Sequence, residues 1–74
     1  MDNKSQYLYI QISDAILERI EAGELKPHER LSSERDLSEE FGVNRLTVRK
    51  ALGMLVSQGV LYKVPSKGTF VAEP

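Results

Sequence analysis

Two arginines and a lysine, Arg45, Arg49 and Lys50, lie close together in the segment VNRLTVRKALGMLVSQG, residues 43–59. An arginine can donate to both acceptors on the major-groove edge of guanine, and any cation can neutralise a phosphate. The rest of the segment is apolar and forms one nonpolar helical face of Val48, Ala51, Leu52, Leu55 and Val56. This pattern predicts a helix over residues 44–58 with a basic start. The alternative is that the charges only solvate the end of a core helix.

Other residues at the start of this helix add candidates for contact with nucleic acid. Asn44 is a good N-cap. The side chains of Asn44 and Thr47 and the free N–H groups of a helix start can hold phosphates. Leu46 points away from the core face and can contact a thymine methyl group. The first two turns therefore combine residue types that read bases with types that hold the backbone.

Four further candidates lie outside this helix. Arg35 stands in the first turn of another expected helix, where the dipole disfavours a cation. A phosphate or base contact explains it, and so does an ion pair with Glu39 four residues on. Lys67 and Gly68 lie in a turn where a lysine can approach the DNA backbone or the minor groove. The alternative for Gly68 is that it serves only the turn geometry. Lys63 is a weaker phosphate candidate.

The spacing of apolar residues, together with cap and turn residues, predicts the elements that position these candidates. An apolar stripe of Leu8, Ile12, Ile16 and Ile20 predicts a helix over about residues 6–22. A short extended stretch follows, anchored by Leu31. Residues 33–42 predict a second helix with Ser33 as cap, and Leu37 and Phe41 facing inward. Only Val43 separates Gly42 from Asn44, and so tight a turn indicates a helix-turn-helix.

The remaining residues change from helical to strand character. Residues 60–64 and 68–72 are β-rich and enclose a Pro-Ser-Lys turn, which predicts a hairpin. An isolated hairpin is marginal in water, so we expect Leu61, Tyr62 and Phe70 to pack it on the helices. The predicted fold is mainly α with a small β-hairpin, a winged helix-turn-helix of three helices plus wing. It covers residues 1–72, and residues 73–74 are expected to begin a linker.

Composition narrows the function. The chain has 74 residues and no cysteine, which suits a reducing cytoplasm, where we expect the protein. No apolar run reaches the roughly 20 residues of a membrane span. His28 is the only histidine and has no partner at metal spacing, and no catalytic set or phosphate loop is visible. We therefore expect no enzyme, cofactor, metal or membrane contact.

The net charge of −1 conceals an asymmetry. Residues 1–44 carry five Lys or Arg and ten Asp or Glu, whereas residues 45–74 carry five and one. Such a split indicates a basic working face on an acidic body.

Three segments together resemble the N-terminal DNA-binding domain of GntR-family bacterial transcription regulators. They are LYIQISDAILERIEAGELKP, LSSERDLSEEFGVNRLTVRKALGMLVSQGVLY and KGTFV. The opening LY.QI is most similar to the HutC-like branch. This chain differs in having Pro27-His28 for the usual Pro-Gly and Asn44 for the usual Ser. The resemblance implies that Arg35, Arg45, Thr47, Arg49 and Gly68 contact DNA.

The same resemblance implies a transcription regulator that binds operator DNA as a homodimer. We expect it to be a repressor that reads an inverted repeat. The resemblance also implies a C-terminal domain, absent from these residues, that binds a small-molecule effector. Two alternatives remain open at this point. A winged-helix protein-interaction module would use the acidic half without DNA readout. An RNA-binding domain would need an exposed aromatic platform, and none is visible.

Overall fold

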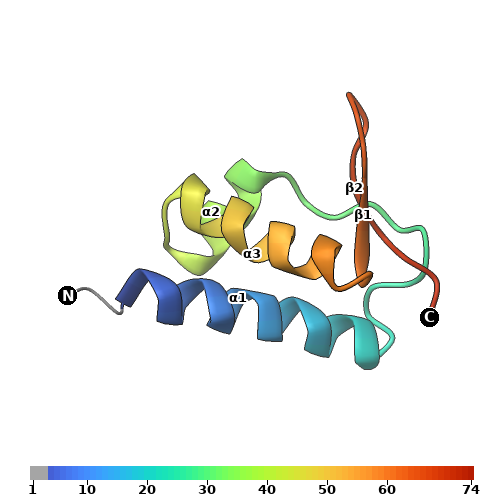
Figure 1. Ribbon diagram of the computed structural model, residues 1–74, viewed down its shortest axis with the longest axis horizontal. Helices are drawn as coiled ribbons and strands as arrows, with labels where there is room; N and C mark the ends of the chain where they lie inside the picture. The colour runs from blue at the N-terminus through green and yellow to red at the C-terminus, as the bar shows by residue number, and fades with distance from the viewer. Residues whose placement is uncertain (1–3) are drawn as a thin grey trace.

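The computed structural model describes the backbone of residues 4–74 and the side chains of residues 7–74. Three helices precede an antiparallel hairpin: α1 (Lys4–Glu21), α2 (Glu34–Phe41), α3 (Arg45–Ser57), β1 (Leu61–Val64) and β2 (Gly68–Val71). Figure 1 shows α3 lying along α1 and the hairpin standing beyond the end of α3. Of the helices so described, none is long and apolar enough to cross a membrane. The predicted winged helix-turn-helix is confirmed, although residues 1–3 of the predicted domain lie outside the described part.

One hydrophobic core holds α1, α3 and the hairpin together. Its buried members are Ile12, Ile16, Leu31, Leu37, Val48, Ala51, Leu52, Leu55, Leu61 and Val71. The prediction that Val56 belongs to the core face of α3 is wrong, because its side chain is 37% exposed. A helix turns about 100° per residue, so each step of four residues drifts by about 40°. The step from Leu52 to Val56 therefore carries the side chain past the edge of the core.

Three local devices set the start and end of α2 and the start of α3. The Ser33 hydroxyl accepts a hydrogen bond from the Asp36 N–H at 3.1 Å and caps α2. Gly42 ends α2 in the left-handed conformation, with φ of +68°, which costs other residues energy. Asn44 then caps α3. The chain therefore leaves one helix and enters the next within three residues, as predicted.

The hairpin presents two different faces. Leu61 and Val71 pair across the strands and are both buried. Tyr62 and Phe70 pair next to them and stack on the other face, with ring centroids 5.6 Å apart. Because neighbouring strand residues point to opposite faces, Leu61 and Tyr62 cannot both enter the core. The prediction that Tyr62 and Phe70 anchor the hairpin is therefore wrong, and Val71 takes that role with Leu61.

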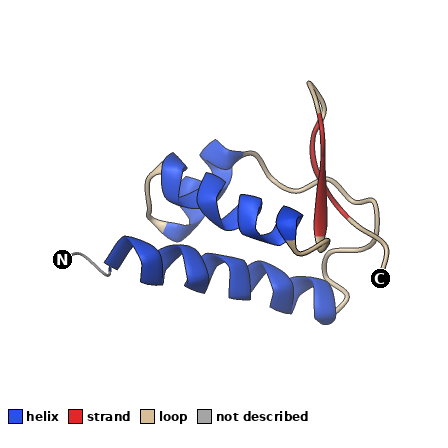
Figure 2. Ribbon diagram, in the orientation of Figure 1, coloured by secondary structure: helices blue, strands red, loops and turns tan. Residues whose placement is uncertain are grey.

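The loop before α2 pairs with the hairpin without forming a strand of its own. Arg30 and Phe70 form an isolated antiparallel bridge. The Leu31 N–H donates to the Thr69 carbonyl at 2.8 Å, and the Val71 N–H donates to the Glu29 carbonyl at 3.0 Å. Figure 2 shows this loop, in tan, passing beside the red hairpin. These bonds fix the hairpin against the loop that leads into α2.

Candidate nucleic-acid interface

The start of α3 is ordered by Asn44. Its side-chain oxygen accepts hydrogen bonds from the Thr47 N–H at 2.8 Å and from the Thr47 hydroxyl at 3.0 Å. Asn44 itself is exposed, whereas Thr47 is only 7% exposed. The predicted cap is thus confirmed. Thr47 acts within the protein by holding Asn44, and a direct contact of its hydroxyl with DNA stays a prediction.

The outward face of α3 carries the predicted readers. Arg45 and Arg49 are exposed, and Leu46 is 69% exposed. At about 100° per residue, Leu46 lies on the side of the helix opposite Val48, whereas Arg45 and Arg49 lie about 60° and 100° from Val48, along one edge of the core face. The structure thus presents all three to solvent.

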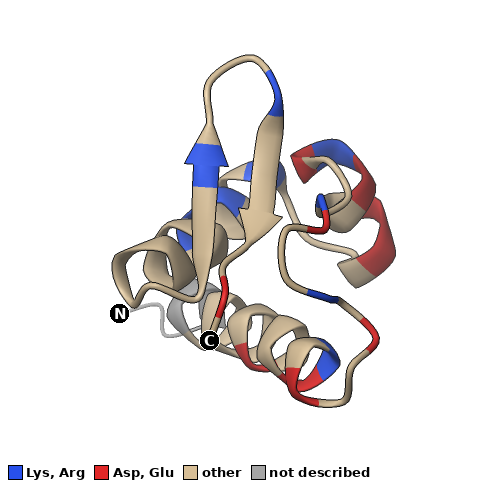
Figure 3. Ribbon diagram, turned by 90° about the vertical axis from the view of Figure 1, so that its right-hand side faces the viewer, with Lys and Arg blue, Asp and Glu red and all other residues tan. Residues whose placement is uncertain are grey.

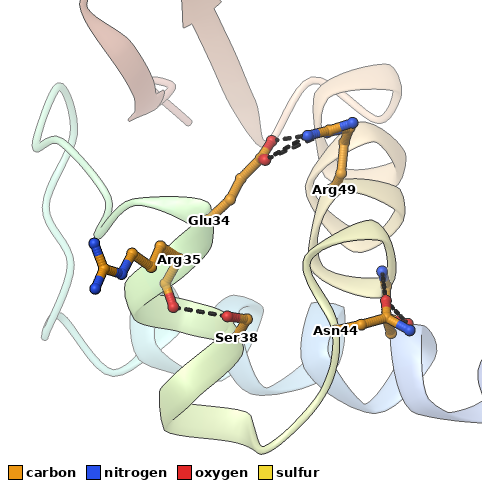
Figure 4. A network of polar contacts seen from close by, with 6 residues as sticks. Glu34, Arg35, Ser38, Asn44 and Arg49 are labelled. Carbon is orange, nitrogen blue, oxygen red and sulfur yellow. Dashed lines mark hydrogen bonds and ion pairs between the residues drawn. The ribbon is translucent and has the colours of Figure 1, made fainter.

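Arg49 is held by a carboxylate from α2. Its Nε donates to both Glu34 oxygens at 3.3 and 3.2 Å, and its Nη2 donates to Oε1 at 3.0 Å. Figure 4 shows Glu34 reaching from α2 across to Arg49. The hydrogen bond from Arg49 lowers the pKa of Glu34 against a smaller opposing effect of burial, and Arg45 and Lys63 add Coulombic attraction. Glu34 was not singled out from the sequence, because 15 positions separate it from Arg49.

Arg35 and Lys50 contact the protein's own side chains. The Nε atom of Arg35 lies 3.7 Å from Oε2 of Glu39, one turn further along α2. This is the ion pair predicted as the alternative. Its side chain points away from α3 in Figure 4. The Lys50 ammonium lies 4.7 Å from the centre of the Tyr9 ring in α1. Both residues are exposed, so a DNA contact stays a prediction for each.

The tip of the hairpin presents Lys67 to solvent. The Lys67 N–H donates to the Val64 carbonyl at 3.0 Å and closes the turn. Gly68 has φ of +126°, which only glycine adopts without strain. A side chain on Gly68 would also meet Arg30, whose Cδ and Nε lie 3.5 Å from the position of its Cβ. Gly68 thus serves the turn and lies beside the Arg30 stem, while its contact with DNA stays a prediction.

A cleft of about 260 Å³ separates the start of α3 from the hairpin, and we call it the wing cleft. Its lining includes Arg30, Glu34, Arg45, Lys63, Gly68 and Thr69. Arg30 was missed in the sequence, where it stands in a loop. The signal was its position next to buried Leu31, because strand alternation directs Arg30 to the opposite face.

Charge is unevenly distributed over the surface. Figure 3 shows Lys and Arg in blue on the hairpin and on the helix behind it, and Asp and Glu in red along α1 and α2. In the part of the chain with described side chains, no group of three or more His, Asp or Glu is placed to hold a metal ion. The basic side therefore combines α3 with the hairpin, as the charge split in the sequence indicated.

The tight turn between α2 and α3, the basic start of α3 and the hairpin beside it define a winged helix-turn-helix domain. Residues 8–71 match the family described as bacterial regulatory proteins, gntR family. The chain belongs to this family, which confirms the resemblance seen in its sequence.

Several repressors are similar to this chain. The HTH-type transcriptional repressor NagR of Bacillus subtilis is 46% identical over 67 residues, which are 90% of this chain and 28% of NagR. The Escherichia coli repressor MngR, of the mannosyl-D-glycerate transport/metabolism system, is 52% identical over 89% of this chain and 28% of its own length. The histidine utilization repressor of Klebsiella aerogenes is 42% identical over 89% of this chain and 27% of its own length. The chain thus spans little more than a quarter of these relatives.

Solved structures share the fold. The DNA-binding domain of AraR in complex with operator ORR3 has a TM-score of 0.85 and 46% identity, covering 88% of this chain and 78% of that one. YtrA from Sulfolobus acidocaldarius, a GntR-family transcription factor, has a TM-score of 0.81 and 44% identity. The match covers 89% of this chain and 69% of YtrA.

Proposed function

We propose that this chain is the DNA-binding domain of a bacterial transcription repressor. In this proposal α3 enters the major groove of an operator and the hairpin lies at the adjacent minor groove. One observation carries it: Arg45 and Arg49 stand exposed on α3, beside a hairpin that carries Lys63 and Lys67. Relatives named as repressors, and a related domain in complex with operator DNA, support the same function.

The residues proposed for the interface have different roles in this complex. Arg45 and Arg49 read guanine, and Leu46 contacts a thymine methyl group. Asn44, Lys50 and Lys67 hold phosphates, as does Arg35 once it leaves Glu39. Thr47 contributes by fixing Asn44, which orients the amide toward the DNA backbone.

The wider organisation of the protein is also a proposal. We infer that residues 73–74 lead into a linker and a C-terminal domain that dimerises and binds a small-molecule effector. The length of the relatives supports this inference. Two such heads would read an inverted repeat, with their α3 helices in successive major grooves. Because the operator DNA of a bacterium lies in its cytoplasm, we expect the protein to work there.

Selection from a pool of random duplex DNA at low salt tests the proposal directly. The chain is immobilised, and the retained DNA is sequenced. We expect one enriched half-site with guanines where Arg45 and Arg49 contact it. The same selection with Arg45→Ala/Arg49→Ala controls for binding by charge alone, and it should enrich nothing.

A pool that is not retained at any salt concentration would overturn the proposal. It would favour the protein-interaction module, for which the acidic surfaces of α1 and α2 would be the working face. Preferential binding of single-stranded or A-form RNA in a parallel selection would favour the RNA-binding alternative.

A further inference from the structure

The wing cleft lies where one strand of a bound duplex must pass. A helix in the major groove and a hairpin in the neighbouring minor groove are separated by one sugar–phosphate strand. In this protein the space between these two elements is the wing cleft. A backbone phosphate is therefore the group that the complex would bring into it.

Cations without carboxylate partners gather in this cleft. All five arginines lie in the described part of the chain, and Arg19, Arg35 and Arg49 each pair with a glutamate. Neither of the other two, Arg30 and Arg45, forms an ion pair with any side chain that the structure describes, and both line the wing cleft. Lys63 joins them there. The carboxylate of Glu34 also lines the cleft, but its charge is bonded by Arg49. The balance of charge thus favours an anion.

The backbone holds Arg30 in place for such a contact. Arg30 is bridged to Phe70, and the bonds of Glu29 and Leu31 to β2 fix the residues on either side. The stem of Arg30 lies against Gly68, where Cδ is 3.5 Å from the place of a side chain. Its contact with Gly68 limits where the stem can lie, so binding a phosphate costs this side chain less conformational entropy than it would cost a stem free in solvent. Thr69 adds a hydroxyl donor to the same lining.

We propose that the wing cleft seats one backbone phosphate of the bound duplex and that Arg30 is its principal cationic ligand. This inference rests on the proposed function, because it names a further contact of the same DNA complex. The phosphate contact is independent of base sequence, unlike the contacts assigned to Arg45 and Arg49.

The test uses Arg30→Met, which keeps an unbranched stem over Gly68 and removes the charge. Dissociation constants are measured across a salt series for the selected half-site and for an unrelated duplex. We expect about tenfold weaker binding to both duplexes. The slope of log K against log salt should fall by about 0.9, the value for one phosphate.

Lys26→Ala is the matched control, because Lys26 is an exposed cation of the same loop that lines a separate groove. Lys26→Ala should leave the slope unchanged.

Duplexes with a single neutral methylphosphonate, moved along the strand, locate the phosphate. At one position the methylphosphonate should weaken DNA binding by the wild-type chain but not DNA binding by Arg30→Met. Arg30→Lys, which keeps a positive charge, should respond as the wild type does. A retained slope in folded Arg30→Met would overturn the proposal. A loss confined to one base pair would also overturn it, in favour of a base contact in the minor groove. If the wild type and Lys26→Ala fail to bind any duplex, the proposed function fails and this inference with it.

Discussion

Arg49 reaches the surface already ordered by another helix. Three hydrogen bonds from its guanidinium to Glu34 restrict its rotamers before any ligand arrives. Nη2 is bonded to Oε1 of Glu34, while Nη1 makes no hydrogen bond to any described side chain. Ordering of this kind lowers the entropy cost of a bidentate contact. The same pair places a negative charge beside the DNA face, which disfavours a misplaced phosphate.

Replacing Arg49 should weaken binding to the selected half-site more than it weakens binding to unrelated duplex DNA. For Arg49→Ala we expect a loss of about 1–3 kcal/mol on the selected half-site, the range of a good bidentate contact. Arg49→Lys should recover affinity for unrelated duplex but not for the half-site, because an ammonium lacks the fork. Fluorescence anisotropy at one salt concentration measures both. Unchanged half-site affinity in folded Arg49→Ala would refute the role.

Glu34 should make stability depend on pH. Its pKa is lower in the folded chain than the ordinary value of 4.5, because Arg49 hydrogen-bonds the carboxylate. The pair therefore stabilises the fold above the unfolded-state pKa, and this contribution is lost as pH falls through the folded-state pKa. Wild type should be slightly more stable than Glu34→Gln at pH 7 and equal to it in acid. The difference is small because Arg49 is in solvent.

Urea midpoints at several pH values measure this effect. Asp14→Asn, which removes an exposed carboxylate from α1, controls for the change in net charge. A gap between wild type and Glu34→Gln that persists at the most acidic pH would contradict the assignment.

Lys67 at the wing tip should act on every sequence alike. For Lys67→Ala we expect equal weakening on the half-site and on unrelated duplex, and a salt slope smaller by about 0.9. The reason is that a lysine neutralises a phosphate as a point charge and reads no base. Salt titrations of both duplexes measure it. An effect limited to one base position would instead indicate readout in the minor groove.

At the scale of the element, the start of α3 couples stability to recognition through Asn44. Its side-chain oxygen caps the helix, and the residue is exposed to solvent. One residue therefore orders the helix and stands on the candidate DNA surface.

Two substitutions separate these roles. Asn44→Ala removes the cap and should lower the free energy of unfolding by about 1 kcal/mol. Asn44→Asp keeps an accepting oxygen and favours the helix dipole, so stability should be retained. The added negative charge should nevertheless weaken DNA binding. Urea denaturation and anisotropy on both variants check this, and equal DNA binding by Asn44→Asp and wild type would exclude a phosphate near Asn44.

At the scale of the whole molecule, a single small core carries both parts of the interface. Leu55 of α3 is 1% exposed and shares the core with Leu61 and Val71 of the hairpin. Because α3 and the hairpin share this core, the position of the wing relative to α3 depends on its packing. The small size of the domain leaves little stability in reserve.

Neighbouring residues of α3 should respond differently to truncation. Leu55→Ala creates a cavity and should cost about 2–5 kcal/mol of unfolding free energy. Val56→Ala should cost less than about 1 kcal/mol, because Val56 is 37% exposed. Both are measured by urea denaturation. Similar costs for the two variants would mean that Val56 packs in the core after all.

The sequence by itself determined the elements and their caps. The stripe of Ile12 and Ile16, the cap residues Ser33 and Asn44, and the glycine after α2 act within a few positions of one another. Such local signals are readable from one chain, because helix periodicity and capping depend on neighbouring residues. The family resemblance and the basic start of α3 were readable for the same reason.

Only the tertiary structure decided which side chains meet. Glu34 contacts Arg49 because α2 crosses α3, and Arg30 reaches Gly68 because residues 29–31 pair with β2. The packing of the hairpin on the helices likewise decided that Val71, rather than Phe70, enters the core. These contacts join residues far apart in the chain, so their geometry follows from how the elements pack together and not from local spacing.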